Sequence, residues 1–182
     1  MAGNIEHFTL PRPDFDKPVK ILIVVAPYYR DIAYDLVAGA KEEIEAAGAT
    51  WDLVEVPGAL EVPTAITIAD RRSNFDGFVA LGCVIRGETS HYDTVCNDSS
   101  RALQMMGLQG LCIGNGILTV ENRDQAIVRA DPTQLNKGGG AAVAALHLVA
   151  LTRKWGSESK GIGFKPLGES IQIAGGDGVK TA

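Results

Sequence analysis

Short apolar runs alternate with amphipathic stretches along most of this sequence, and no other feature restricts the fold as strongly. The first run, VKILIVVAP at 19–27, is continuous and rich in β-branched residues, which is typical of a strand buried on both faces. Later apolar runs predict further strands at 50–58, 75–85 and 108–119. Apolar residues at helical spacing predict helices at 31–48, 59–72, 90–107, 120–131 and 136–155.

This strand–helix alternation implies a parallel sheet with helices on both faces. The sequence therefore predicts an α/β fold, a three-layer αβα sandwich around a four-stranded parallel sheet. We expect one domain at 19–155, because there is no tandem repeat or interior linker. The proline-containing segment 1–18 predicts an N-terminal arm, and the Gly- and Ser-containing segment 156–182 predicts a flexible C-terminal tail.

Composition excludes several classes of function. The net charge of −5 disfavours nonspecific binding to nucleic acid or to anionic membranes. No apolar run reaches the ~20 residues of a membrane span, and the acidic, proline-broken start is unlike a signal peptide. The odd set of Cys83, Cys96 and Cys112 indicates reduced thiols, so we expect a cytoplasmic protein.

Polar clusters follow three predicted strands: PYYRD at 27–31, VPGALE at 56–61 and VIRGETSHYD at 84–93. Because the carboxyl ends of parallel strands meet at one edge of a sheet, we expect these clusters to share a rim where a ligand binds. A fourth cluster, RADPTQLNKGGG at 129–140, lies between two predicted helices. Convergence of several clusters predicts a small-molecule site.

The third cluster carries groups that bind an anion and move a proton. The helix entrance after Gly87 exposes backbone N–H groups that favour an anion. The alternative is that Thr89 or Ser90 is an ordinary N-cap of the helix. His91 stands in the first helical turn, where the helix dipole favours a neutral imidazole base; a structural histidine is the alternative. Arg86 either binds the anion or pairs with an acidic neighbour.

The other clusters offer complementary groups. Tyr28 and Tyr29 cannot both point inward at a strand end, so at least one is free to stack on a planar ligand. Glu61 either complements the dipole of its helix or accepts hydrogen bonds from a polyol. Arg129 and Lys137 supply cations for a phosphate or are ordinary surface charges.

Sharper motifs are absent. CVIR at 83–86 has too few residues between its cysteine and arginine for a phosphatase loop. GNGIL at 114–118 lacks the third glycine of a dinucleotide fingerprint. No His or Cys spacing predicts a metal site.

The segments VPGALEVP, ALGCVIRGETSHYDTV, GNGILTVENRDQAI and NKGGGAA together resemble the lumazine synthase family, over residues 19–155. The resemblance implies a flavodoxin-like fold and a transferase without a metal or organic cofactor. It implies condensation of 5-amino-6-(ribitylamino)uracil with 3,4-dihydroxy-2-butanone 4-phosphate. The products are 6,7-dimethyl-8-ribityllumazine, phosphate and water, in the penultimate step of riboflavin biosynthesis. In this family the active site lies between neighbouring subunits of a pentamer.

The resemblance also implies residue roles. In the family an aromatic ring stacks on the pyrimidine, a turn with a carboxylate binds the ribityl chain, and strand backbone reads the uracil edge. The matching positions are Tyr28 for the ring, Gly58, Ala59 and Glu61 for the turn, and Val84 and Ile85 for the strand.

Further positions match the groups that handle phosphate and protons. The phosphate loop matches Gly87, Glu88 and Thr89, although Glu88 is expected to point into solvent or toward another subunit. His91 matches the proposed proton-transfer residue, Arg129 the phosphate-binding arginine, and Lys137 the lysine near the pyrimidine.

Assembly features depart from part of the family. Asn115 falls where a neighbouring subunit often supplies an aromatic ring, and this chain has no ring there. Icosahedral members carry a glycine-containing turn that ADPTQLN at 130–136 lacks, so we expect a homopentamer or decamer. Cys83 replaces a commoner threonine and is expected to be inert packing.

Two other functions fit the same scaffold less well. A noncatalytic flavin or lumazine carrier would keep Tyr28 and Glu61 but could dispense with His91 and Arg129, which are present. A flavodoxin-like electron carrier needs a Ser/Thr-rich phosphate loop after the first strand, where APYYRD stands instead.

Overall fold

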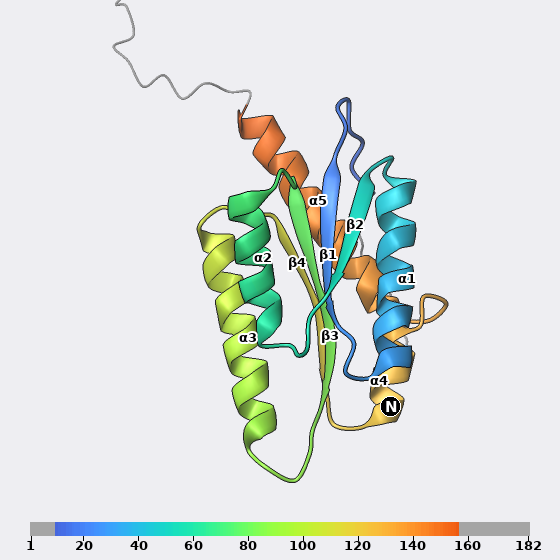
Figure 1. Ribbon diagram of the computed structural model, residues 1–182. Coiled ribbons are helices and arrows are strands. Elements are labelled where there is room, and N and C mark those ends of the chain that lie inside the picture. Colours follow the sequence, from blue (N-terminus) through green and yellow to red (C-terminus); the bar gives the residue numbers. More distant parts are fainter. Residues whose placement is uncertain (1–9, 157–182) are drawn as a thin grey trace, which may run out of the picture.

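The computed structural model describes residues 10–156, in which strands and helices alternate as far as α4 (Figure 1). The strands are β1 (Lys20–Ala26), β2 (Thr50–Glu55), β3 (Gly77–Ile85) and β4 (Ile113–Val120). The helices are α1 (Arg30–Ala46), α2 (Glu61–Arg72), α3 (His91–Leu108), α4 (Arg123–Ala130) and α5 (Lys137–Gly156).

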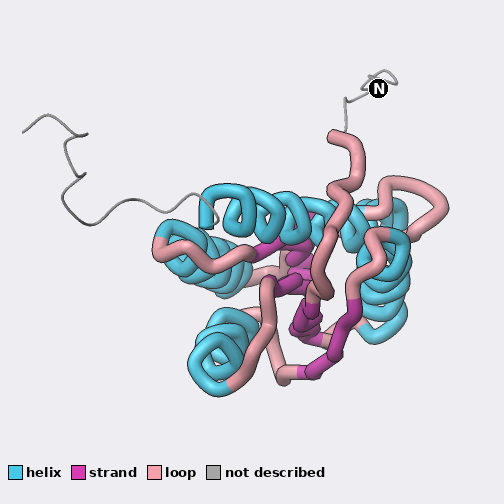
Figure 2. The backbone as a smooth tube through the Cα atoms, turned by 90° about the horizontal axis from the view of Figure 1, so that it is seen from above, coloured by secondary structure: helices cyan, strands magenta, loops and turns pink. Residues whose placement is uncertain are grey.

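The four strands are all parallel and stand in the order β2-β1-β3-β4. Helices α1, α4 and α5 pack on one face of the sheet, and α2 and α3 pack on the other (Figure 2). In β1, Ile21 and Ile23 face the core under α1 and α5, whereas Leu22 and Val24 face the core under α2. A strand buried on both faces needs a continuous apolar run. The predicted αβα sandwich is confirmed.

Two element starts differ from the prediction by three residues or more. Strand β4 begins at Ile113 rather than at 108, because α3 runs to Leu108 and a turn with Gly110 at φ +99° follows it. Helix α4 begins at Arg123, because the side chain of Asn122 accepts a hydrogen bond from a backbone N–H and caps the helix there. In both places the turn chemistry, rather than the apolar pattern, sets the boundary.

Gly138 near the start of α5 and Gly114 of β4 are packing residues. A Cβ at Gly138 would lie 2.0 Å from the carbonyl oxygen of Leu36 in α1, and one at Gly114 of β4 would lie 1.8 Å from that of Ala141. A side chain at either position would therefore overlap backbone. The glycines allow α5 to lie directly against α1 and the edge strand, which fixes the position of Lys137 at its start.

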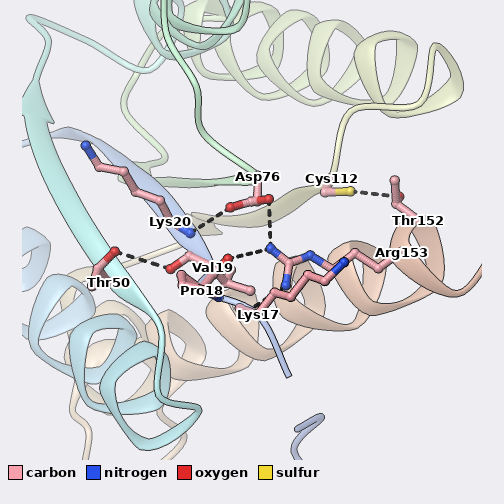
Figure 3. Close-up of polar contacts among 9 residues, drawn as sticks. All are labelled: Lys17, Pro18, Val19, Lys20, Thr50, Asp76, Cys112, Thr152 and Arg153. Carbon is pink, nitrogen blue, oxygen red and sulfur yellow. Dashed lines mark hydrogen bonds and ion pairs between the residues drawn. The ribbon is translucent and has the colours of Figure 1, made fainter. Parts of the chain in front are cut away.

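An arginine near the end of α5 fixes the point at which the chain enters the sheet (Figure 3). Arg153 donates to the carbonyl oxygens of Lys17 at 2.8 Å and Pro18 at 2.6 Å, and to Asp76 Oδ1 at 3.0 Å. Asp76 Oδ2 accepts a hydrogen bond from the backbone N–H of Lys20 at 2.8 Å. One guanidinium thus joins α5, the segment before β1 and the segment before β3.

The structure describes residues 10–18 of the predicted arm. Residues 10–18 form neither helix nor strand, yet Phe15 packs against the core and Arg12 pairs with Glu43 of α1 at 2.8 Å. The first nine residues, and the predicted tail after Gly156, lie outside the described residues.

Candidate functional site

A cavity of about 440 Å³ opens at the carboxyl ends of β1 and β3 and at the starts of α2 and α3. The predicted site residues among its lining are Tyr28, Gly58, Ala59, Glu61, Val84, Ile85, Gly87, Thr89 and His91. The three polar clusters that follow strands therefore share one rim, as the parallel sheet predicts.

Two tyrosines follow β1 at the cavity. Tyr28 leaves 75% of its surface exposed, whereas Tyr29 is half-buried and packs against the core. Their rings meet edge to face, with centroids 5.1 Å apart. Tyr29 therefore supports an exposed ring that is available to a planar ligand, which confirms the expectation that one of the two is free.

The turn before α2 brings a carboxylate over a glycine. The backbone N–H of Glu61 donates to the carbonyl oxygen of Gly58 at 3.1 Å, and a Cβ on Gly58 would lie 2.9 Å from Glu61 Oε2. Glu61 also stands in the first turn of its helix. Glu61 therefore complements the dipole of its helix and also lines the cavity, so binding of a polyol there stays a prediction.

The loop between β3 and α3 carries Gly87, Thr89 and His91 along the cavity. Ser90 occupies the N-cap position of α3, but its side chain makes no capping hydrogen bond. The ordinary capping interpretation therefore does not hold for Ser90. Glu88 is exposed and does not line the cavity, which agrees with the expectation that it points away from a bound anion.

Arg86 pairs with acidic neighbours. Its Nε donates to Glu121 Oε2 at 2.8 Å, its Nη1 lies 3.2 Å from Asp93 Oδ1, and its guanidinium lies 4.0 Å from the centre of the Tyr92 ring. Burial alone would lower the pKa of Arg86, but the hydrogen bonds to Glu121 and Asp93 outweigh it and raise that pKa. Of the two interpretations of Arg86, the structure favours the ion pair.

Cys83 lies at the inner side of the cavity and is only 6% exposed. Burial raises the pKa of its thiol to about 11, because the thiolate would be poorly solvated there. A neutral buried thiol is a small apolar group rather than a nucleophile.

The remaining predicted residues lie elsewhere. Asn115, Arg129 and Lys137 line a second concavity of about 480 Å³, formed by the edge strand β4 with α4 and α5. None of the three lines the first cavity. Asn115 Oδ1 accepts from the backbone N–H of Ile117 at 3.0 Å, and Arg129 Nη1 donates to the carbonyl oxygen of Gln125 at 3.0 Å. One chain therefore does not bring all the predicted residues together.

Sequence reasoning missed other residues of the first cavity. Ala26, Pro57, Leu60, Tyr92 and Val95 also line it. Val95 lies four residues after His91 and three after Tyr92, so the helical spacing of α3 could have indicated that Val95 neighbours both of them.

Among residues 10–156, no group of three or more His, Cys, Asp or Glu side chains is arranged to hold a metal ion. Within the same range, every helix is too short or too polar to cross a membrane.

Comparison with known proteins adds to this geometry. A family model described as 6,7-dimethyl-8-ribityllumazine synthase matches residues 18–153. A protein of that name from Jannaschia sp. (strain CCS1) is 62% identical over 176 residues, covering 97% of this chain and 98% of the relative. Another from Novosphingobium aromaticivorans is 52% identical over 136 residues, covering 75% of this chain and 98% of the relative. A 6,7-dimethyl-8-ribityllumazine synthase 1 from Rhizobium meliloti is 53% identical over 148 residues, covering 78% of this chain and 97% of the relative.

Proposed function

The chain belongs to the 6,7-dimethyl-8-ribityllumazine synthase family, and from that premise we propose how its residues divide the work of catalysis. It is a transferase that condenses 5-amino-6-(ribitylamino)uracil with 3,4-dihydroxy-2-butanone 4-phosphate. The products are 6,7-dimethyl-8-ribityllumazine, phosphate and water, in the penultimate step of riboflavin biosynthesis.

The first cavity binds the pyrimidine substrate in this proposal. The exposed Tyr28 ring stacks on the pyrimidine, and the carboxylate of Glu61 accepts hydrogen bonds from ribityl hydroxyls over the Gly58–Ala59 turn. The backbone at Val84 and Ile85, where β3 ends, reads the uracil edge. The observation that carries this assignment is the convergence of all these residues on one cavity of about 440 Å³.

The loop after β3 binds the phosphate of the second substrate. Backbone N–H groups at 87–89 and the hydroxyl of Thr89 hold the anion at the helix entrance. His91 lies beside them in the cavity and moves protons between the reacting groups. Glu88 contributes only its backbone, because its carboxylate would repel the phosphate.

These groups fit each step of the reaction. The substrate amine attacks the ketone carbon to give a carbinolamine, and loss of water gives an imine, with His91 delivering and removing protons. Removal of the proton at C3 then breaks the C4–O bond to phosphate, and the departing dianion is held by N–H groups and a guanidinium. The enol that forms takes up a proton at C4 and becomes a ketone at C3. The ribityl-bearing amine closes the ring onto this ketone with loss of a second water. Holding the ribityl-bearing amine close to the carbonyl that it attacks supplies much of the rate acceleration.

A second copy of the chain completes the site. We assign Asn115, Arg129 and Lys137 of a neighbouring subunit to the open side of the first cavity, where Arg129 reaches phosphate and Lys137 the pyrimidine. The separate concavity that these three residues line in one chain supports this arrangement.

Exposed apolar side chains also support an assembly. Leu108 leaves 79% and Trp155 59% of their surfaces exposed, beside a mainly apolar groove of about 350 Å³ between α3 and α5. We assign the active form to a homopentamer or decamer, with 19–155 as the enzyme domain and with 1–18 and 156–182 as arm and tail. We place it in the cytoplasm, without nucleic-acid or membrane partners.

Direct synthesis tests the activity. The purified protein is mixed with both substrates, and 6,7-dimethyl-8-ribityllumazine is followed by its absorbance and fluorescence. We expect the product to accumulate with release of inorganic phosphate in equal amount. Binding of the lumazine without its formation would instead indicate the noncatalytic carrier.

A further inference from the structure

The turn that joins β4 to α4 lies at the same end of the sheet as the loops around the cavity (Figure 1). Its residues 121–123 do not line the cavity. Glu121 and Arg123 nevertheless carry opposite charges, and each pairs with a different loop that does line it.

Glu121 holds the phosphate loop through Arg86. The Arg86 guanidinium bonds to Glu121 and Asp93 and stacks on the ring of Tyr92, which lines the cavity. The backbone N–H of Arg86 also donates to the carbonyl oxygen of Val120 at 2.9 Å. The segment from 86 to 93 is therefore fixed at both ends, with Gly87, Thr89 and His91 between the fixed points.

Arg123 holds the tyrosine loop, the segment at 27–31 that carries Tyr28 and Tyr29. Its Nη2 bonds to the carboxylate of Asp31, two residues beyond Tyr29 in the first turn of α1. Burial alone would raise the pKa of Asp31, but the bond to Arg123 and backbone N–H groups lower it below the ordinary value. The ion pair thus restrains the start of α1, directly after Tyr28 and Tyr29, which line the cavity.

The turn itself is held by reciprocal hydrogen bonds. The backbone N–H of Gln125 donates to Asn122 Oδ1 at 3.0 Å, and Gln125 Oε1 accepts from the backbone N–H of Glu121 at 3.0 Å. Both ion pairs therefore start from one fixed piece of backbone. Neither Glu121 nor Arg123 needs to touch a substrate to influence the geometry of the cavity.

We propose that Glu121 and Arg123 are positioning residues that set the two substrate-binding loops independently. Glu121 positions the phosphate loop through Arg86, and Arg123 positions the tyrosine loop through Asp31. The proposal rests on the assignment of these loops to the phosphate and pyrimidine substrates. Its consequence is that the KM values of the two substrates depend on different residues of the same turn.

Steady-state kinetics with both substrates test this separation. Glu121→Gln is expected to raise the KM for the four-carbon phosphate about fivefold, the scale of one exposed ion pair, and to leave the KM for the pyrimidine unchanged. Arg123→Gln is expected to do the reverse. Glu121→Asp and Arg123→Lys, which keep the charges, should restore part of each loss. Asp98→Asn, which neutralises an exposed carboxylate on α3 away from the cavity, serves as the control and should change neither KM.

Hydrogen exchange gives a readout that does not need turnover. Peptides covering 86–91 should exchange faster in Glu121→Gln only, and peptides covering 27–33 should exchange faster in Arg123→Gln only. Equal changes in both KM values, or the same exchange profile in both variants, would overturn the proposal while leaving the activity intact. If the wild-type protein forms no lumazine, the functional assignment fails and the exchange profiles alone decide whether the turn positions the loops.

Discussion

His91 and Arg129 belong to the same chain but line two different concavities. His91 lies where β3 passes into α3, whereas Arg129 lies beside the edge strand β4 near the start of α5. A reaction that needs both a proton-transfer group and a phosphate-binding cation would have to draw them from two different concavities of one chain. The arrangement supports the proposed site built from two copies.

Replacing His91 with alanine tests the division of labour in the cavity. We expect kcat to fall by about 10²-fold, the lower end for one acid–base group, because positioning and phosphate binding remain. The KM for the pyrimidine should stay near the wild-type value. Steady-state kinetics with both substrates check this. Loss of both activity and pyrimidine binding would show that His91 has another role.

Two neighbouring glycines of α5 predict opposite effects on stability. Gly138→Ala should destabilise the protein by about 1–3 kcal/mol, because its Cβ would overlap the carbonyl oxygen of Leu36. A Cβ at Gly140 meets no atom within 4 Å, so Gly140→Ala should stabilise the helix by about 0.5–1 kcal/mol. Thermal unfolding at one protein concentration compares the two variants. Similar shifts in the same direction would contradict the close packing of α5 on α1.

Removing the arginine at the end of α5 should loosen the entry to the sheet. Arg153→Gln leaves the carbonyl oxygens of Lys17 and Pro18 and the carboxylate of Asp76 without their donor. We expect a loss of about 1–3 kcal/mol in the free energy of unfolding. Arg101→Gln is the matched control, because Arg101 is exposed and pairs only with Asp98 at 3.9 Å among the described contacts. If both variants unfold at the same denaturant concentration, Arg153 does not hold this junction.

The pKa of Cys83 predicts resistance to alkylation. With a thiol pKa of about 11, roughly one Cys83 in a thousand is a thiolate at pH 8, and burial also blocks the reagent. Mass spectrometry after brief treatment with iodoacetamide should find Cys83 unmodified in the native protein and modified in urea. Because the folded pKa is raised, the stabilisation from the neutral thiol is present below about pH 9 and is lost as the pH rises through 11. Rapid native labelling at pH 8 would contradict this environment.

Apolar pattern was enough to predict the layers of the fold. The run at 19–27 predicted a doubly buried strand, and β1 indeed supplies both cores. Boundaries set by side-chain hydrogen bonds, such as the Asn122 cap of α4, could not be read from apolar spacing. The packing role of Gly138 could not be predicted either, because it depends on the backbone of Leu36, which approaches it only in the folded chain.

The candidate site was predictable where its residues follow strands. Tyr28, Glu61 and His91 meet because parallel strands end on one rim. Arg86 could not be assigned from sequence, since its partner Glu121 is 35 residues away. The sequence placed Arg129 between two predicted helices rather than after a strand, but residue order does not show that those helices pack beside the edge strand β4, in a different concavity from His91.

Complementation between two inactive variants tests the shared site most directly. His91→Ala combined with Glu61→Gln disables the first cavity, and Arg129→Gln combined with Lys137→Gln disables the second concavity. Each double variant alone should form little lumazine. When both are co-expressed and purified together through different tags, about one quarter of the sites in a closed ring should combine two intact halves. We predict lumazine formation at about a quarter of the wild-type rate; activity no higher than that of the separate variants would contradict a site shared between copies.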